Sequence, residues 1–252
     1  MRGSSRRKID YLLIDISNSY TKLAYSTREH VARPVRIPTA QLSSARLRKY
    51  LRRRDVGAII VSSVVPAKNA VVVKAAAHSR VLFVDAKCRL GVGIQYPAPA
   101  KIGADRLANA AAVAQLYGRP AIVVDFGTAV TFDVVSASGD YVGGVIAPGL
   151  EAMTTFLYQR TALLPKLTLR EPASAIGKTT RAAMTSGAVY GYRGLVREIL
   201  ARIRQESFPQ ARVRVVATGG YAELIGAQLP EIEAVHPGLT LEGLRLVANL
   251  NV

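Results

Sequence analysis

The sequence predicts an α/β protein made of two similar halves, and three observations support this prediction. A polar turn after an apolar run occurs at Asp15 and recurs at Asp125, which is 110 residues later. Each turn lies between two β-type runs, so each is typical of a hairpin whose first strand ends in Asp. Alternating strand and helix patterns follow each hairpin. A domain-sized period then predicts two domains, residues 1–117 and 118–252, that divide at Gly118-Arg119-Pro120.

In the first half, apolar periodicity predicts three further strands and three helices. The strands are expected at 31–37, 57–64 and 81–84, and the helices at 42–53, 69–78 and 105–117. Pro34 marks the first of these strands as a sheet edge, because proline cannot donate a ladder hydrogen bond. The continuous apolar run at 58–61 is typical of a buried parallel strand.

In the second half the same order of elements is expected. Strands are predicted at 121–124, 130–135, 140–146 and 213–217, and helices at 150–160, 179–205 and 241–249. Three glycines between Gly187 and Gly194 predict a break in the long helix. Thr218-Gly219-Gly220 forms a turn between a strand and a helix, where it serves either as a simple glycine turn or as a close approach to a nucleotide.

The composition argues against a disulfide-bonded, secreted or membrane-spanning protein. Half of the 252 residues are hydrophobic, and Cys88 is the single cysteine, so no intramolecular disulfide can form. The basic N-terminus is similar to the start of a signal peptide, but Asp15 interrupts the apolar run behind it. No uncharged apolar stretch approaches about 18 residues, so we expect no membrane span. These features together predict a cytoplasmic protein.

The net charge of +17 leaves two interpretations open. Its densest cluster spans residues 46–54 and is either a nucleic-acid contact or the solvated face of a helix. Tyr50 is the only aromatic residue in this cluster and the chain has no Trp. Direct nucleic-acid binding as the main role is therefore disfavoured, although the charge does not exclude it.

The two hairpin turns have the residues that a phosphate site needs. Small side chains at Ser17, Asn18 and Ser19 let backbone amides approach oxygen atoms, and the second turn has Gly127 and Thr128. The aspartates that precede the turns can hold or orient a cation. An ordinary polar hairpin turn is the alternative for the first motif.

Gly103-Ala104-Asp105-Arg106 opens a predicted helix with an acid next to a base. Asp105 either stabilises the helix start by about 0.3–1 kcal/mol or accepts a substrate proton while Arg106 anchors an anion. Phosphoryl transfer to an alcohol requires both of the latter functions.

Other nucleotide and catalytic motifs are disfavoured. Gly177-Lys178-Thr179 lacks the first glycine of a P-loop, because Pro172 occupies that position. The three histidines do not cluster with Cys88, so a zinc site is not expected. No pattern in the sequence indicates a Ser-His-Asp triad.

The ordered set of motifs resembles the type III pantothenate kinases, a branch of the actin-like superfamily of acetate and sugar kinases and chaperone ATPases. The similarity covers nearly the whole chain. The motifs that carry it are Asp15 to Lys22, Gly103 to Arg106, Asp125 to Ala129, Gly143-Gly144, Ala147-Pro148-Gly149, Thr161 to Pro165, Thr218-Gly219-Gly220 and Leu239 to Leu244.

The resemblance implies two ribonuclease-H-like domains with mixed sheets, flanking helices and an active site in the interdomain cleft. It implies phosphorylation of pantothenate by ATP, the first step toward coenzyme A. Asp105 is then the general base, and the substrate residues are Tyr96, Gly103, Ala104, Asp105, Arg106 and Thr180. The ATP-phosphate residues are Asp15, Ile16, Ser17, Asn18, Ser19, Tyr20, Thr21, Lys22 and Thr128.

The resemblance also implies a potassium or ammonium ion at Asp125, a divalent cation such as magnesium, and a homodimer. The chain departs from the family at Ser17, where Gly is usual, and at Thr179, where Asn is usual. If residue 17 required a positive φ, Ser would cost about 1–2 kcal/mol and weaken ATP binding. A nucleotide-binding transcriptional accessory protein of the same fold is the alternative function.

Overall fold

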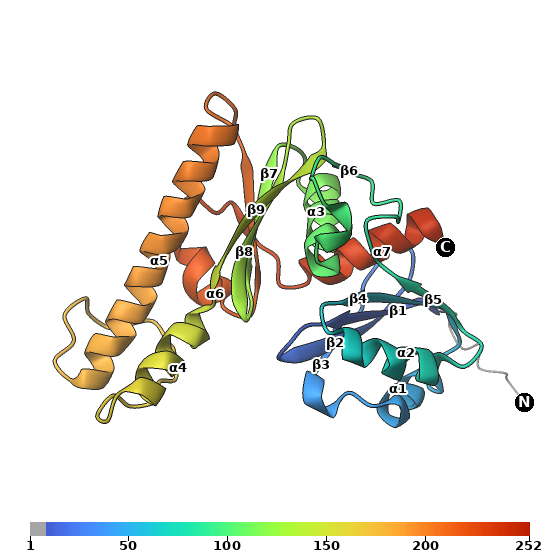
Figure 1. Cartoon of the computed structure of the whole chain (residues 1–252), viewed down its shortest axis with the longest axis horizontal. Coiled ribbons are helices and arrows are strands. Elements are labelled where there is room, and N and C mark those ends of the chain that lie inside the picture. The colour runs from blue at the N-terminus through green and yellow to red at the C-terminus, as the bar shows by residue number, and fades with distance from the viewer. Residues whose placement is uncertain (1–8) are drawn as a thin grey trace, which may run out of the picture. The chain divides into compact units, whose positions relative to one another are not determined.

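The computed structural model describes residues 9–252, which form two compact units (Figure 1). One unit contains the described residues up to Leu116 together with Leu239–Val252, and the other contains Tyr117–Gly238. The last helix therefore belongs to the first unit by its contacts, whereas the boundary expected from sequence assigned it to the second domain. The basic N-terminal segment considered above as a signal-peptide start, residues 1–8, lies outside the described residues.

The first unit is built on a five-stranded sheet of order β3-β2-β1-β4-β5. Its strands are β1 (Ile9–Ile16), β2 (Tyr20–Ser26), β3 (Val35–Pro38), β4 (Val56–Ser63) and β5 (Arg80–Phe83), and a short β6 (Gly93–Ile94) follows. Strand β1 pairs antiparallel with β2 and parallel with β4. Strand β3 lies at the sheet edge, as Pro34 predicted, and it begins directly after that proline.

The described part of the first unit contains four α-helices. They are α1 (Ser44–Leu51), α2 (Asn69–Ala76), α3 (Ala104–Leu116) and α7 (Leu239–Asn251). One apolar cluster joins alternate residues of β1 and β4, such as Leu12 and Ile59, to Leu47 of α1 and Val72 of α2. Residues of β1 between these positions, such as Leu13, are also fully buried. The strand is therefore covered on both faces, and this explains its unbroken apolar run.

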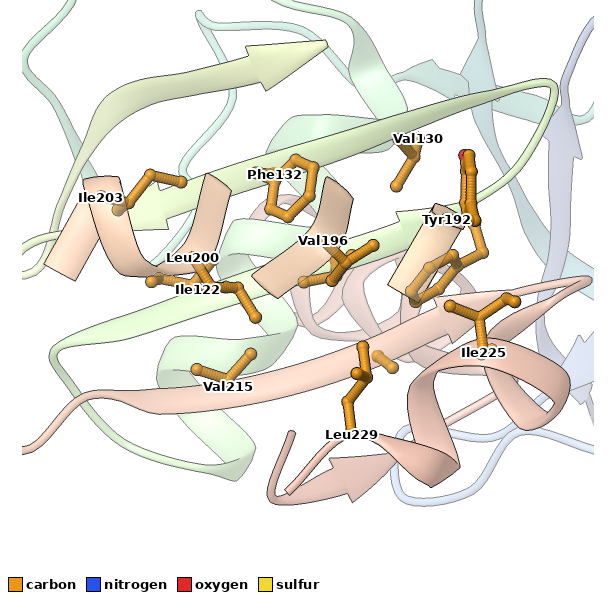
Figure 2. Close-up of a cluster of buried hydrophobic side chains, with 14 of the residues drawn as sticks. Ile122, Val130, Phe132, Tyr192, Val196, Leu200, Ile203, Val215, Ile225 and Leu229 are labelled. Carbon is orange, nitrogen blue, oxygen red and sulfur yellow. The ribbon is translucent and has the colours of Figure 1, made fainter. Parts of the chain in front are cut away.

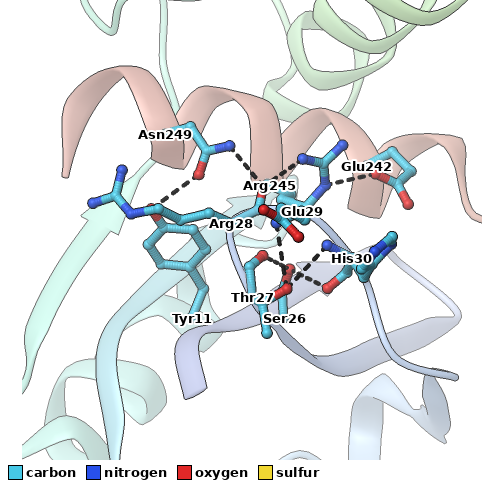
Figure 3. Close-up of polar contacts among 9 residues, drawn as sticks. All are labelled: Tyr11, Ser26, Thr27, Arg28, Glu29, His30, Glu242, Arg245 and Asn249. Atoms are coloured by element: carbon cyan, nitrogen blue, oxygen red, sulfur yellow. Dashed lines mark hydrogen bonds and ion pairs between the residues drawn. The ribbon is translucent and has the colours of Figure 1, made fainter. Parts of the chain in front are cut away.

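Helix α7 is attached to the first unit by close packing and by polar contacts. A Cβ on Gly243 would lie 2.0 Å from the carbonyl oxygen of Ala108 in α3, so only glycine fits there. Figure 3 shows the polar side, where Arg245 Nη1 and Asn249 Nδ2 donate to the carbonyl oxygen of Arg28 at 2.6 and 2.9 Å. Tyr11 Oη of β1 donates to Asn249 Oδ1 at 3.0 Å. The C-terminal helix is thus an integral part of the first unit.

In the second unit the strands lie in the order β11-β10-β7-β8-β9. They are β7 (Ala121–Phe126), β8 (Ala129–Val135), β9 (Asp140–Pro148), β10 (Arg214–Gly219) and β11 (Ala234–Val235). The helices are α4 (Leu150–Arg160), α5 (Thr180–Ser207) and α6 (Ala222–Ile225). Figure 2 shows Tyr192, Val196 and Leu200 of α5 over Ile122, Phe132 and Val215 of the sheet.

Helix α5 is continuous, so the break expected near Gly187–Gly194 is wrong. Glycines 187, 191 and 194 have no heavy atom within 4 Å of an added Cβ, so they neither require close packing nor mark a turn. The buried stripe of Val189, Tyr192, Val196 and Leu200 spans the same region. Burial of this stripe outweighs the cost of about 1 kcal/mol for each helical glycine.

The two sheets repeat one topology. Replacing β1, β2, β3, β4 and β5 by β7, β8, β9, β10 and β11 converts one strand order into the other. The aspartates at the ends of the first strands correspond as well: Asp15 pairs in register with Ser62 of the parallel neighbour, and Asp125 with Thr218. The prediction of two similar α/β halves is confirmed.

Candidate active site

The first hairpin turn is closed by a hydrogen bond from Ser17 N to Tyr20 O of 3.1 Å. Among described non-glycine residues only Ala77 has a positive φ, so Ser17 causes no left-handed strain and the reason given for weaker ATP binding does not hold. Asp15 is 3% exposed at the end of β1, whereas Asn18, Ser19 and Tyr20 are exposed. The turn therefore presents small polar residues next to a buried carboxylate.

Thr39 fixes the shape of the first turn. Its hydroxyl donates to Ser17 O at 2.7 Å and its backbone N–H donates to Ser19 O at 3.0 Å. Thr21, expected to offer a hydroxyl to phosphate, is fully buried, and its Oγ1 lies 3.0 Å from Thr39 Oγ1. In this structure the Thr21 hydroxyl supports the turn from within. No local pattern in the sequence indicated this role for Thr39.

The second hairpin turn lies against the backbone of two other glycine turns. A Cβ on Gly149 would be 2.2 Å from Thr128 O, and the N–H of Gly149 donates to that oxygen at 3.1 Å. Gly219 has a φ of +93°, and a Cβ there would be 2.6 Å from Asp125 Oδ1. Gly127 and Thr128 are exposed beside them. The strand ends of β7, β9 and β10 thus form one glycine-lined surface next to a carboxylate.

Tyr192 supports this surface from the core. Its hydroxyl donates to Pro148 O at 3.0 Å, directly before Gly149. The side chain is 1% exposed, and burial raises the pKa of this phenol to about 12, so it remains a protonated donor. The sequence did not indicate this role for Tyr192, because its pattern predicted only that the residue lies in a helix.

Oxygen ligands for a monovalent cation are available beside Asp125. Thr218 is its register partner on β10, and the buried Thr218 Oγ1 has no hydrogen-bond partner among the described residues. Gly219 leaves the space that a side chain would take from the carboxylate. A carboxylate and a hydroxyl fit a hard cation that prefers oxygen. Within residues 9–252 no group of three His, Cys, Asp or Glu side chains forms a metal cluster.

Asp105 lies in the first turn of α3 and is half-buried. The backbone N–H of Arg106 donates to Asp105 Oδ1 at 2.8 Å. A Cβ on Gly103 would lie 2.6 Å from the same oxygen, so the absence of a side chain at 103 permits this carboxylate position. The structure thus places Gly103, Ala104, Asp105 and Arg106 together at one helix start.

The remaining substrate candidates belong to other segments of the chain. Tyr96 is 38% exposed and precedes the 3₁₀ turn Pro99–Lys101 of the first unit. Thr180 is the exposed first residue of α5 in the second unit. Thr179 caps that helix, because its side chain accepts from Ala182 N at 3.2 Å. Thr and Asn are both good capping residues, so the change from the usual Asn keeps the helix start.

An ion pair holds the segment between α4 and α5. Arg193 Nη1 and Nη2 donate to Glu171 Oε1 and Oε2 at 2.9 and 2.5 Å, and Nη2 also donates to Leu224 O at 2.7 Å. The hydrogen bonds from Arg193 lower the pKa of the Glu171 carboxyl. This pair attaches the stretch that leads to Thr180.

Solved structures with a similar fold come from several functional classes. A Campylobacter jejuni protein described as a conserved member of the Baf family of transcriptional activators matches with a TM-score of 0.63 at 16% identity, over 94% of this chain and 97% of that chain. Component A of the (R)-2-hydroxyglutaryl-CoA dehydratase of Acidaminococcus fermentans matches with a TM-score of 0.52 at 13% identity, over 96% of each chain. These likenesses show the fold, which is that of the actin-like proteins with two ribonuclease-H-like units.

Sequence comparison is more specific. Residues 11–202 match the family described as type III pantothenate kinase. A type III pantothenate kinase of Akkermansia muciniphila is 50% identical over 244 residues, which cover 96% of this chain and 99% of that protein. Relatives 42% and 39% identical over 95% of this chain have the same description. The chain therefore belongs to the type III pantothenate kinase family.

Proposed function

We propose that this protein transfers the γ-phosphoryl group of ATP to the primary hydroxyl of pantothenate, the first step toward coenzyme A. The family match over residues 11–202 carries this proposal. The position of Asp105 supports it, because a half-buried carboxylate at a helix start, next to a glycine that leaves it room, is suited to hold an alcohol.

In the proposed reaction Asp105 orients the alcohol of pantothenate and accepts its proton. An alcohol is a weak nucleophile, and a carboxylate within hydrogen-bond reach aligns it with the γ-phosphorus. The oxygen–phosphorus bond forms as the bond from the γ-phosphorus to the bridging oxygen of ADP breaks. Arg106 neutralises an anionic group of a substrate. Tyr96, Gly103, Ala104 and Thr180 complete the pantothenate contacts, as the family resemblance implies.

Binding of ATP is assigned to both hairpin turns. Residues 15–22 of the first unit, apart from the buried Thr21 hydroxyl, and Thr128 of the second supply amide and hydroxyl donors to the phosphates. In a loose transition state, charge neutralisation and positioning contribute more than the strength of the base. Thr39, Gly149 and Tyr192 act as positioning residues, since they hold these turns in shape.

Two cations belong to the proposal. Asp125 and Thr218 would hold a potassium or ammonium ion, which supplies positive charge near the phosphates. A divalent ion such as magnesium would accompany ATP, and Asp15, the carboxylate at the first turn, would orient it. In this assignment both aspartates at the ends of β1 and β7 serve the phosphates of ATP.

A homodimer is also proposed, and exposed apolar side chains of the second unit support it. Phe156 of α4, Leu163 and Ile176 are 60%, 89% and 80% exposed. Large apolar side chains that a subunit interface covers are expected to be exposed in the single chain. Light scattering of Phe156→Glu should show a monomer, whereas Val73→Glu on α2, where the side chain is 58% exposed, should leave the dimer intact.

A cytoplasmic location is proposed from the expected role in coenzyme A biosynthesis. Within the described chain, no helix combines the length and apolar character that crossing a membrane requires. The regulatory alternative is not favoured, because its support is a fold likeness at 16% identity, whereas the kinase family matches over most of the chain.

The function is tested by coupling ADP formation to a spectroscopic readout, with ATP, pantothenate, magnesium and potassium present. The wild type should phosphorylate pantothenate, and the rate of Asp105→Asn should be about 10²- to 10⁴-fold lower while ATP still binds. A wild type that binds ATP without turning over pantothenate would exclude the proposal.

A further inference from the structure

The positive charge is concentrated in one unit. The described residues of the first unit contain 18 Lys and Arg against 7 Asp and Glu, a net charge of +11. The second unit contains 12 against 10, a net charge of +2. Self-repulsion of this size disfavours a compact unit, and neither the fold nor the kinase reaction described above requires it. The excess therefore calls for a partner of opposite charge.

Much of the excess lies on and directly after α1. Arg46, Arg48, Lys49, Arg52, Arg53 and Arg54 are all exposed. None of these six forms an ion pair with another described residue, whereas Arg193, Arg197, Arg202, Arg212 and Arg214 of the second unit all pair with Glu. Arginines that only improve solubility would be expected to pair in the same way in both units. We call these six residues the α1 basic face.

One side of the α1 basic face lines a groove of about 460 Å³. Arg46, Lys49 and Tyr50 line it at spacings that put them on one side of α1, and Arg53 lines it from the turn directly after the helix. No acidic residue lines the groove. Arg46 Nη1 donates to Gln41 Oε1 at 2.9 Å, and Arg53 lies 5.7 Å from the centre of the Tyr50 ring. The groove is therefore a preformed surface for anions.

We propose that the α1 basic face binds the phosphate backbone of double-stranded nucleic acid without reading its bases. Five of the six cations are arginines, whose guanidinium group matches phosphate oxygens in pairs. The single aromatic residue, Tyr50, is half-buried and faces Arg53, so the face has no stacking platform for a single strand. No large apolar side chain of α1 is exposed, as insertion into a membrane surface would require.

The size of α1 sets the expected strength. Eight helical residues span about 12 Å, which matches about three phosphate steps along one strand. Each neutralised phosphate contributes about −0.9 to the slope of log K against log salt concentration. Replacing the three groove cations should therefore reduce the size of that slope by about 2 to 3.

The test is fluorescence anisotropy of a labelled 20-base-pair DNA duplex with the full chain over a series of potassium chloride concentrations. The variant Arg46→Gln/Lys49→Gln/Arg53→Gln is compared with Arg197→Gln/Arg202→Gln/Arg212→Gln, which removes the same charge from exposed positions of the second unit. For the first variant we expect the slope of log K against log salt concentration to be smaller in size by about 2 to 3, and the affinity at low salt to be at least tenfold lower. The second variant should keep the slope and the affinity of the wild type, and both variants should still phosphorylate pantothenate.

Three results would overturn the proposal. They are equal losses in both variants, no duplex binding by the wild type at 50 mM salt, and tighter binding to vesicles of anionic lipid than to the duplex. If the triple variant is unstable, Lys49→Gln alone keeps the test decisive, because this exposed side chain makes no hydrogen bond or ion pair with a described residue. It should still reduce the slope by about 1.

Discussion

Replacing Gly103 by Ala tests whether the position of Asp105 determines the rate. An added Cβ would lie 2.6 Å from Asp105 Oδ1, and ordinary contact begins at about 3.4 Å, so the oxygen must move by about 0.8 Å. The other neighbours, Val64 Cγ1 and Arg106 Cγ, are 3.6 and 3.7 Å away and need not move. Gly103 has no positive φ, so Ala adds no left-handed strain. The change therefore displaces one carboxylate and little else.

A displacement of about 1 Å at a reacting group costs about 10²-fold in rate. We therefore expect kcat of Gly103→Ala to fall about 10²-fold, with the KM for ATP and the melting temperature nearly unchanged. The control is Gly187→Ala in α5, where no heavy atom lies within 4 Å of the new methyl group. Steady-state kinetics and differential scanning fluorimetry measure both variants.

Two outcomes would contradict this reasoning. If Gly103→Ala keeps kcat within threefold of the wild type while Asp105→Asn is inactive, Gly103 does not set the carboxylate position. If the melting temperature of Gly103→Ala falls by more than about 5 °C, the residue has a structural role that the contacts do not explain.

Three further predictions concern the support of the fold and of the cation site. In Gly219→Ala the new Cβ would lie 2.6 Å from the backbone N and C atoms of Phe126, at a φ of +93°. The free energy of unfolding in urea should therefore fall by about 1–3 kcal/mol, and any increase in rate with potassium over sodium should disappear. An unchanged increase would place the cation elsewhere. Arg193 lowers the pKa of Glu171, so their bond should favour the folded state above the unfolded pKa of about 4.3 and lose this effect as pH falls through the folded value. Glu171→Gln should therefore reduce the melting temperature more at pH 7 than at pH 3, and equal losses at both pH values would refute the linkage. Gly243→Ala would put a Cβ 2.0 Å from the carbonyl oxygen of Ala108, so it should destabilise the first unit by about 1–3 kcal/mol in urea unfolding, and a wild-type midpoint would show that α3 and α7 can separate without cost.

Most elements were predictable because their apolar periodicity matched their burial. The helix at 150–160 has the bounds that its pattern predicted, and β4 and α2 differ by one or two residues. The short β11 (Ala234–Val235) was missed, since two residues carry no periodicity. The continuity of α5 was missed because a glycine count does not show that its opposite face is fully buried.

The parts of the site in which glycines and aspartates are close in sequence could be predicted. The residues that hold the turns by hydrogen bonds from distant parts of the sequence could not. The turn at Asp125–Thr128 and the helix start at Gly103–Arg106 were legible as local motifs. Thr39 holds the first turn from 22 residues away, and Tyr192 holds Pro148 from 44 residues away. Hydrogen bonds over such separations leave no local pattern. The residue assignments for substrate and cation remain predictions until the assays above are made.

The return of α7 to the first unit has a consequence for biosynthesis. Residues up to Leu116 emerge from the ribosome early, yet the helix that packs on α3 at Gly243 and bonds Arg28 through Arg245 and Asn249 begins only at Leu239. Until α7 has left the ribosome, the parts of β1 and α3 that it covers stay exposed, and exposed apolar surface in such a state promotes aggregation or chaperone binding. A chain that stops before Leu239 would therefore have an incomplete first unit.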